Sequence, residues 1–279
     1  MKEFQSVGKT VEGNEGTKCH YPTRLDTYGC GCQHDCSYCY AKSLLDFRKN
    51  WHPDNPSVAD LGKVKNEIKK LDRSVPVRLG GMTDCFQPME KLHRVTYKTI
   101  RMLNKARQPY LIVTKSHFVA DDEYLCILDK NLAHVQITVT TLDDDLCRTY
   151  EKASPPSKRI EAIKKLQENG IDVALRLSPF IPEYMDTEKL ATLGIDKVVI
   201  EFLRVNSWVK KWFDIDYTPY TLSSGGYWHL PLERKKELIQ SVKGFKEMTV
   251  CEDEDEAYLY WQKHFNHNPN DCCNLRGNS

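Results

Sequence analysis

The stretch Gly29-Cys30-Gly31-Cys32-Gln33-His34-Asp35-Cys36-Ser37-Tyr38-Cys39-Tyr40-Ala41 contains three cysteines, Cys32, Cys36 and Cys39, in the spacing C-x3-C-x2-C. Thiolates are soft ligands that favour iron–sulfur clusters or zinc. Ordinary cubane clusters take four cysteines, whereas this loop offers a tight trio without an obvious fourth partner. Three thiolates suit a cluster in which three irons are held by the protein and the fourth stays open. The spacing therefore predicts a [4Fe–4S] cluster on these three cysteines.

Zinc is the alternative metal for this loop. A structural zinc site needs four protein ligands, usually in two pairs with C-x2-C-like spacing, so Cys30 or His34 would have to complete the set. A disulfide framework is disfavoured, because the 279-residue chain does not need staples, its start lacks an apolar run and its eleven cysteines are an odd number. These features predict a reduced, cytoplasmic protein that binds a metal cluster.

The length and net charge of the chain limit its domain organisation and its partners. A chain of 279 residues forms one large α/β domain, or one domain with an appendix. Forty basic and thirty-nine acidic residues give a net charge of +1. Such a balance is no nucleic-acid signature by itself, although a local patch can bind nucleic acid on a neutral protein. No stretch of the sequence approaches the length of a membrane span, so we expect no membrane partner.

Short β-rich runs alternate with helical patterns along most of the chain, which predicts a parallel sheet covered by helices. Apolar residues from Leu92 to Leu103 mark one helix face, and those from Ile160 to Leu166 mark another before Gly170. This alternation predicts a partial or complete (β/α) barrel, with function at the carboxyl ends of the strands. The pattern does not choose between six and eight units. The predicted strands are residues 23–28, 75–81, 110–114, 134–140, 173–177 and 197–202.

Three of the predicted strands end in residues suited to ligand binding. Gly80-Gly81-Met82-Thr83-Asp84 ends one strand, Lys115 follows the next, and Thr140 ends the third. Glycines let a backbone approach a ligand closely, although an ordinary strand-to-loop turn has the same composition. Because the carboxyl ends of barrel strands meet on one face, we expect these residues to lie near the cysteine loop.

These features together resemble the radical S-adenosylmethionine (SAM) superfamily and, within it, the spore photoproduct lyase-like proteins, which are also described as DNA repair photolyases. The resemblance extends from about Gly29 to Asp186. The segments that carry it are 31–41, 83–90, 114–116, 138–141, 151–159 and 179–182.

The resemblance implies a partial (β/α)6 barrel over residues 1–205, followed by an aromatic-rich segment and a cysteine-containing C-terminal extension over residues 206–279. It implies that SAM binds the open iron and is cleaved by one electron to a 5′-deoxyadenosyl radical, which abstracts a hydrogen atom. The electron comes from a reductant such as flavodoxin or ferredoxin. The residues expected to form the SAM pocket are Gly80, Gly81, Thr83, Asp84, Lys115 and Thr140.

By the same resemblance, the substrate is a damaged or modified base in DNA or another nucleic acid, and the reaction is a lyase-like DNA repair. A base would have to leave its stack to reach a buried site. The runner-up is a radical SAM enzyme acting on a peptide or a small metabolite. The alternative outside enzymes is a zinc-stabilised nucleic-acid-binding module.

Three residues are candidates for handling the radical. The hydrogen-donating cysteine of the lyases aligns with Gly81, so it is absent from its expected place, and Cys85 is a candidate for a displaced donor. The other interpretation of Cys85 is a small buried side chain, the usual environment of a free cysteine. Tyr38 and Tyr40 match the tyrosines that help to relay the radical in the lyase, whereas packing against the cluster loop is the simpler explanation.

Two features of the C-terminal third stay open in the sequence. The segment from Asn206 to Leu230 mixes seven aromatic residues with Lys210 and Lys211, and we interpret it as a packing element rather than a base-stacking surface. Cys251, Cys272 and Cys273 offer ligands for a second metal, with His264, His267 or Cys19 as the fourth, or alternatively a redox pair or hydrogen donors.

Overall fold

The fold is known from a computed structural model, which describes residues 4–9 and 18–275. Its centre is a sheet of eight strands in the order β1-β2-β5-β6-β7-β8-β9-β12, in which β1 is antiparallel to β2 and each later neighbour is parallel. From β2 onward the order follows the chain, so the sheet curls as a partial barrel. The strands are β1 (Val7–Lys9), β2 (Thr23–Leu25), β5 (Val77–Leu79), β6 (Tyr110–Thr114), β7 (Ala133–Thr138), β8 (Asp172–Phe180), β9 (Lys197–Phe202) and β12 (Glu247–Val250).

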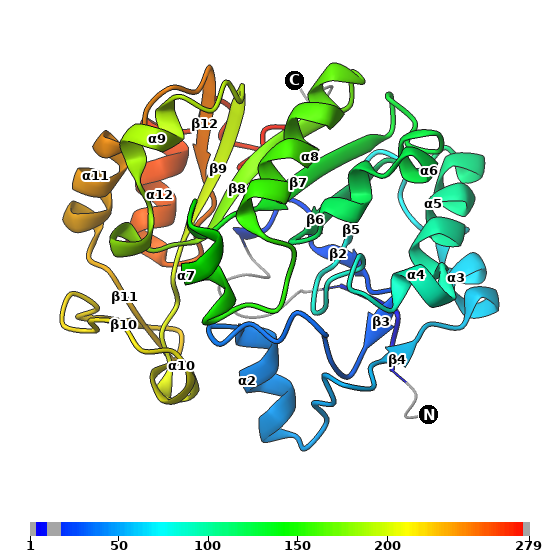
Figure 1. Cartoon of the computed structure of the whole chain (residues 1–279), viewed down its shortest axis with the longest axis horizontal. Coiled ribbons are helices and arrows are strands. Elements are labelled where there is room, and N and C mark those ends of the chain that lie inside the picture. The colour runs from blue at the N-terminus through cyan, green and yellow to red at the C-terminus, as the bar shows by residue number, and fades with distance from the viewer. Residues whose placement is uncertain (1–3, 10–17, 276–279) are drawn as a thin grey trace.

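Helices cover the outside of this sheet (Figure 1). One flank carries α3 (Leu61–Ile68), α4 (Glu90–His93), α5 (Val95–Ala106) and α6 (Asp122–Leu125), and the other carries α9 (Thr187–Ala191), α11 (Leu232–Ser241) and α12 (Asp255–His264). Between them lie α7 (Asp144–Arg148) and α8 (Pro156–Glu168). Within the described ranges, no helix has both the length and the apolar character that a bilayer crossing requires.

Smaller elements surround the cysteine loop. Helix α2 (Tyr40–Phe47) follows the loop directly and contacts α10 (Ser207–Trp212) at the lower edge of the molecule (Figure 1). The remaining short elements are β3 (Tyr28–Gly29) paired with β4 (Ser57–Val58), β10 (Leu222–Ser224) paired with β11 (Tyr227–His229), and the 3-10 turns η1 (His117–Ala120) and η2 (Pro182–Tyr184).

The predicted partial barrel is confirmed, and one helix prediction is wrong in detail. Each of the six predicted strands corresponds to an observed strand of the sheet, and β6 and β9 have the predicted bounds. Leu92, however, is 78% exposed and does not share the buried face of α5. The reason is that Arg94 adopts a left-handed conformation with φ 55°, which separates α4 from α5. In α8 the predicted apolar residues from Ile160 to Leu166 are buried.

The segment that follows residue 205 contributes to the same sheet. Strand β12 pairs in parallel with β9, with Glu247 opposite Lys197. Helix α12 then begins at Asp255, and acidic residues occupy its first turn, where they suit the positive end of the helix dipole. The acidic run before this helix is only partly solvated, because Glu252 is buried against Lys235, with 2.5 Å between Oε2 and Nζ.

Candidate functional site

The cysteine loop lies between β3 and α2 and is held in a compact path by its own backbone. The N–H of Cys39 donates to the carbonyl of Cys36 at 3.2 Å, and α2 begins at the next residue. Gly31 packs so closely that a Cβ there would lie 2.2 Å from the carbonyl oxygen of His52. The loop is also joined to the region after α7, where the N–H of Lys152 donates to the carbonyl of His34 at 2.8 Å.

The three cysteines of the loop lie on one cavity of about 200 Å³, which we call the thiol cavity. Their thiols form no disulfide. Burial raises the pKa of Cys32 to about 12 and also raises the pKa of Cys36 and of Cys39. Without a metal, the site therefore favours neutral thiols, and an iron–sulfur cluster would supply the positive charge that makes thiolate ligands favourable. Two buried thiols and the half-buried thiol of Cys39 beside an open space fit a cluster that keeps one iron accessible.

The glycine strand end after β5 forms another part of the wall of the thiol cavity. Gly80 has φ 81°, and a Cβ on it would lie 2.6 Å from the carbonyl oxygen of Val113. A side chain at this position would therefore strain the backbone and collide with β6. Tyr40 fixes the next residue, because its hydroxyl donates to the carbonyl of Gly81 at 2.6 Å. The predicted site residues that line the thiol cavity are Cys32, Cys36, Cys39, Tyr40, Gly80, Gly81, Thr83, Asp84 and Lys115.

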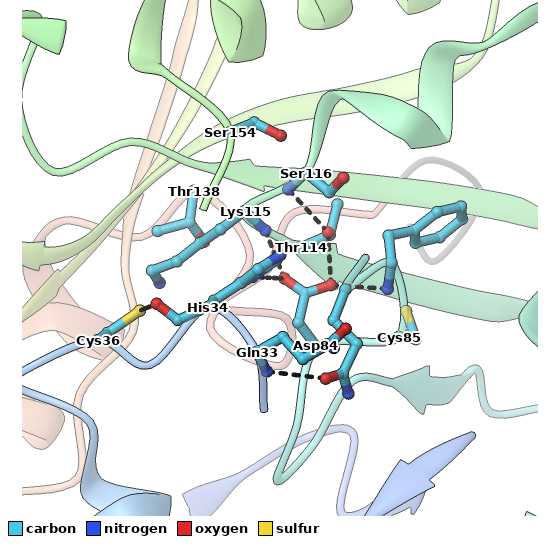
Figure 2. A network of polar contacts seen from close by, with 12 residues as sticks. Gln33, His34, Cys36, Asp84, Cys85, Thr114, Lys115, Ser116, Thr138 and Ser154 are labelled. Carbon is cyan, nitrogen blue, oxygen red and sulfur yellow. Dashed lines mark hydrogen bonds and ion pairs between the residues drawn. The ribbon is translucent and has the colours of Figure 1, made fainter. Parts of the chain in front are cut away.

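Asp84 connects the cysteine loop to the end of β6 (Figure 2). Its carboxylate accepts from the Thr114 hydroxyl at 2.7 Å and from the Lys115 N–H at 2.6 Å, and it lies 3.2 Å from Nδ1 of His34. Burial alone would raise the pKa of Asp84, but His34 and these donors outweigh burial and lower it to about 2. The carboxylate therefore stays charged, and its hydrogen bonds are made within the protein.

A second buried carboxylate, Glu151, contacts the cysteine loop through Tyr38. Nη2 of Arg159 lies 2.5 Å from its Oε2, and neither side chain is exposed. The hydroxyl of Thr140 donates to Oε1 at 2.9 Å, and Tyr38 from the loop donates to the same oxygen. Burial opposes the charge of Glu151, yet Arg159 and Lys115 lower its pKa to about 2. The ion pair therefore anchors the loop through Tyr38.

Charged side chains also occupy the inward-facing positions of β8 and β9. Arg176 donates to Oε2 of Glu201 at 2.6 Å and to Gln136 at 2.7 Å. Arg204 approaches the other oxygen of Glu201 at 3.3 Å and Asp253 at 2.9 Å. Burial raises the pKa of Glu201, but the two arginines outweigh it and lower that pKa to about 2. These residues line the thiol cavity and were not identified from the sequence.

Three predicted site residues do not line the cavities described here. Tyr38 and Thr140 are buried in the network around Glu151. Cys85 is fully buried in the core and lies on the opposite side of Asp84 from Cys36 (Figure 2). This location matches the interpretation of Cys85 as a small buried side chain.

The aromatic segment after residue 205 mostly packs. Phe213 contacts Tyr38 with ring centroids 5.6 Å apart and belongs to the main core. Lys210 lies over the ring of Trp228 at 4.3 Å. The segment therefore forms a wall against the cysteine loop, whereas Trp228, at 37% exposed, remains partly open to solvent.

Comparison with known proteins agrees with this geometry. A partial (β/α) barrel with three thiols on the cavity at its strand ends defines a class of iron–sulfur enzyme. The model of the Radical SAM superfamily matches residues 27–193, more than half of the chain, and the chain belongs to this superfamily. Membership implies a [4Fe–4S] cluster and SAM as cofactors, together with a need for an electron donor.

Two relatives have detectable sequence similarity. Protein MJ0683 of Methanocaldococcus jannaschii is 31% identical over 164 residues, which cover 57% of this chain and 60% of the relative. Protein ORF301 of Acidianus two-tailed virus is 24% identical over 203 residues, covering 63% and 65%. The matched region thus spans less than two thirds of either relative.

Solved structures share the fold at low sequence identity. Spore photoproduct lyase complexed with dinucleoside spore photoproduct has a TM-score of 0.64 and 16% identity, with 83% of this chain and 78% of that chain covered. SuiB of Streptococcus suis bound to the precursor peptide SuiA has a TM-score of 0.57 and 13% identity, with 85% and 50% covered. These likenesses support the fold alone.

Proposed function

We propose that this protein is a radical SAM enzyme whose cluster is held by Cys32, Cys36 and Cys39. The observation that carries the proposal is that these three thiols, two buried and Cys39 half-buried, share one cavity with the glycine strand end of β5. When bound, the cluster and SAM supply a 5′-deoxyadenosyl radical that abstracts a hydrogen atom. The role of the surrounding chain is to orient SAM and to exclude water and competing C–H bonds.

The residues around the cavity divide into two proposed roles. Gly80, Gly81, Thr83 and Lys115 border the open space, so we assign them to SAM binding. Lys115 suits a carboxylate, because the hydrogen bond of its Nζ to the carbonyl of Ser178 is long, at 3.4 Å. The oxygens of Asp84 are already bonded to Thr114 and the Lys115 backbone. We therefore assign to Asp84 the positioning of the cysteine loop.

Thr140, Tyr38 and Tyr40 support the site from outside the reacting atoms. Thr140 donates to Glu151, and Tyr38 donates to the same carboxylate. Tyr40 fixes Gly81 through its hydroxyl. We propose that these three residues hold the loop and the glycine strand end in register. A radical relay through the tyrosines, and hydrogen donation by Cys85, remain predictions.

For the substrate we propose a damaged or modified nucleic-acid base. A second cavity of about 530 Å³ adjoins the first and shares Gly81, Arg78 and Arg204 with it. Its wall also contains Arg48 and Tyr227. Arginines suit phosphate oxygens and aromatic rings suit base faces, and the structurally similar spore photoproduct lyase was solved with a dinucleoside lesion. A peptide is the second candidate. SuiB was solved with a precursor peptide, and this chain has Gly81 where the lyases have their hydrogen-donating cysteine.

The direct test is release of 5′-deoxyadenosine from SAM by anaerobically reconstituted protein. Dithionite replaces the proposed flavodoxin or ferredoxin donor. We expect release by the wild type and by Cys126→Ala, an exposed cysteine that serves as the matched control, and none by Cys36→Ala. Equal release by Cys36→Ala would contradict the cluster assignment.

The same signal then discriminates between substrates. A dinucleotide carrying a thymine lesion and a short peptide are added in parallel, and the true class accelerates 5′-deoxyadenosine formation. Acceleration by the peptide alone would replace the nucleic-acid proposal with the second candidate.

A further inference from the structure

Four cysteines outside the loop converge on the thiol cavity. Cys19 precedes β2, Cys251 directly follows β12, and Cys272 and Cys273 lie in the C-terminal turn. All four line the cavity together with the cluster cysteines. Sγ of Cys272 lies 3.8 Å from Sγ of Cys251. We call these four residues the tail thiol cluster.

Specific contacts build the turn that presents two of these thiols. The carboxylate of Asp271 accepts from the N–H groups of Cys273 at 3.0 Å and Leu275 at 2.7 Å. Asn274 adopts a left-handed conformation with φ 51°, and its carbonyl accepts from Nζ of Lys197 at 3.1 Å. The turn is therefore fixed both internally and to strand β9.

The lead-in to the sheet is joined to the same place. Nζ of Lys18 donates to the carbonyl of Asp253 at 2.8 Å, which holds Cys19 beside the segment that follows Cys251. Nδ1 of His20 lies 3.3 Å from the N–H of Cys272 and accepts from it. Chain segments more than 230 residues apart thus meet at four thiols.

Two arginines border the tail thiol cluster, because Arg78 and Arg176 line the same cavity as its four thiols. The guanidinium of Arg78 interacts electrostatically with Cys19, and that of Arg176 interacts with Cys251 and Cys273. A divalent ion with four thiolates carries a net negative charge, which neighbouring guanidinium groups would stabilise.

We propose that Cys19, Cys251, Cys272 and Cys273 bind a second metal centre, distinct from the cluster on the loop. Four thiolates complete a closed site for zinc, and the same number serves an iron–sulfur cluster. Metal–sulfur bonds of about 2.3 Å place tetrahedral sulfurs about 3.8 Å apart, which is the distance between Cys251 and Cys272. This pair matches two ligands of a single zinc-type ion, whereas among the described residues no three of these sulfurs lie within 4.8 Å of one another, so a bound ion would draw the other thiols inward. Such a centre ties the lead-in, β12 and the tail across the base of the thiol cavity.

The test removes the first site and counts metal at the second. The variant Cys32→Ala/Cys36→Ala/Cys39→Ala is purified anaerobically, and its zinc, iron and acid-labile sulfide are measured per chain. We expect about one zinc; about four irons with sulfide would instead identify a cluster on the same four ligands. Either metal supports a second centre, and neither metal in a folded chain would overturn it.

A further substitution assigns the bound metal to the tail. Cys272→Ser is added to the triple variant, and Cys126→Ser, at an exposed cysteine, is the matched control. We expect the variant with Cys272→Ser to lose its metal and the variant with Cys126→Ser to retain it. Equal metal in both would overturn the assignment.

If Cys272→Ser does not fold, a thiol-specific mercurial is titrated into the triple variant with the tail intact. Release of metal in step with modification of four thiols supports the site, and release without it contradicts the site. Because no step uses SAM, the outcome is independent of the proposed enzymatic function.

Discussion

Replacing Arg159 with methionine is expected to destabilise the fold by about 3–5 kcal/mol, the usual cost of removing one partner from a buried ion pair. Arg159 and Glu151 are both fully buried, with 2.5 Å between Nη2 and Oε2. Methionine fills much of the arginine volume but leaves the Glu151 carboxylate without its counter-ion. The loss should also loosen the cysteine loop, because Tyr38 donates to the same carboxylate.

The pKa of Glu151 provides a second route to this magnitude. In the folded chain, burial is outweighed by Arg159 and Lys115, and the pKa is lowered from 4.5 to about 2. A carboxylate with a lowered folded pKa stabilises the protein above its unfolded pKa and loses that contribution as the pH falls towards the folded value. The difference corresponds to about 3–4 kcal/mol, at about 1.4 kcal/mol for each pKa unit. The two routes agree.

Urea unfolding followed by circular dichroism, on metal-free reduced protein, measures this loss at about pH 7 and about pH 3. The control is Arg148→Met, because the side chains of Arg148 and Asp145 are 62% and 89% exposed and such pairs contribute about 0–1 kcal/mol. We expect the difference in unfolding free energy between wild type and Arg159→Met to be smaller at the lower pH. A loss no larger than that of the control, or a difference that does not change with pH, would refute the reasoning.

Three further predictions concern the cavity. Gly80→Ala should lower the free energy of unfolding in urea by about 1–3 kcal/mol, because φ is 81° and a Cβ would lie 2.6 Å from a carbonyl oxygen of the next strand. The control Gly194→Ala should lower it less, because φ is 69° there and a Cβ would lie in open space. Asp84→Asn should make the cluster iron about 10-fold more easily removed by a chelator, and an unchanged loss rate would count against its positioning role. Lys115→Ala should weaken SAM binding about 10-fold or more, since a charge-assisted hydrogen bond contributes about 1.5–3 kcal/mol. Equal SAM affinity of the variant and the wild type by calorimetry would exclude Lys115 as a SAM-binding residue.

The cluster loop is predictable because its three ligands lie within eight residues of one another. Neither their number nor their spacing depends on distant parts of the chain. Strands β6 and β9 are predictable for a similar reason, since each contains a short run of consecutive apolar residues, 110–113 and 198–200, typical of a buried parallel strand. Local sequence therefore contains the metal-binding motif and the centre of the sheet.

The contacts that support the site join residues far apart in the chain, and local sequence patterns predict only some of them. Strand β12 has four residues and precedes an acidic run, so its apolar signal is too short to separate from a loop. The convergence of Cys19 with the tail cysteines depends on where the lead-in and the last turn meet the barrel. Cysteine counting suggested Cys19 only as one of three candidate fourth ligands.

The ion pair between Arg176 and Glu201 inside the barrel, by contrast, could have been predicted from the sequence. Arg176 and Glu201 each interrupt an apolar strand, and a buried charge requires a partner. In the parallel register Arg176 lies opposite Val199, and Glu201 is two residues further along β9, so both side chains face the same side of the sheet. After its first residue, each of these two neighbouring strands carries one charge, and such a pair of charges predicts an ion pair once the register is known. Here it places that pair on the wall of the thiol cavity, where Arg176 and Glu201 meet at 2.6 Å.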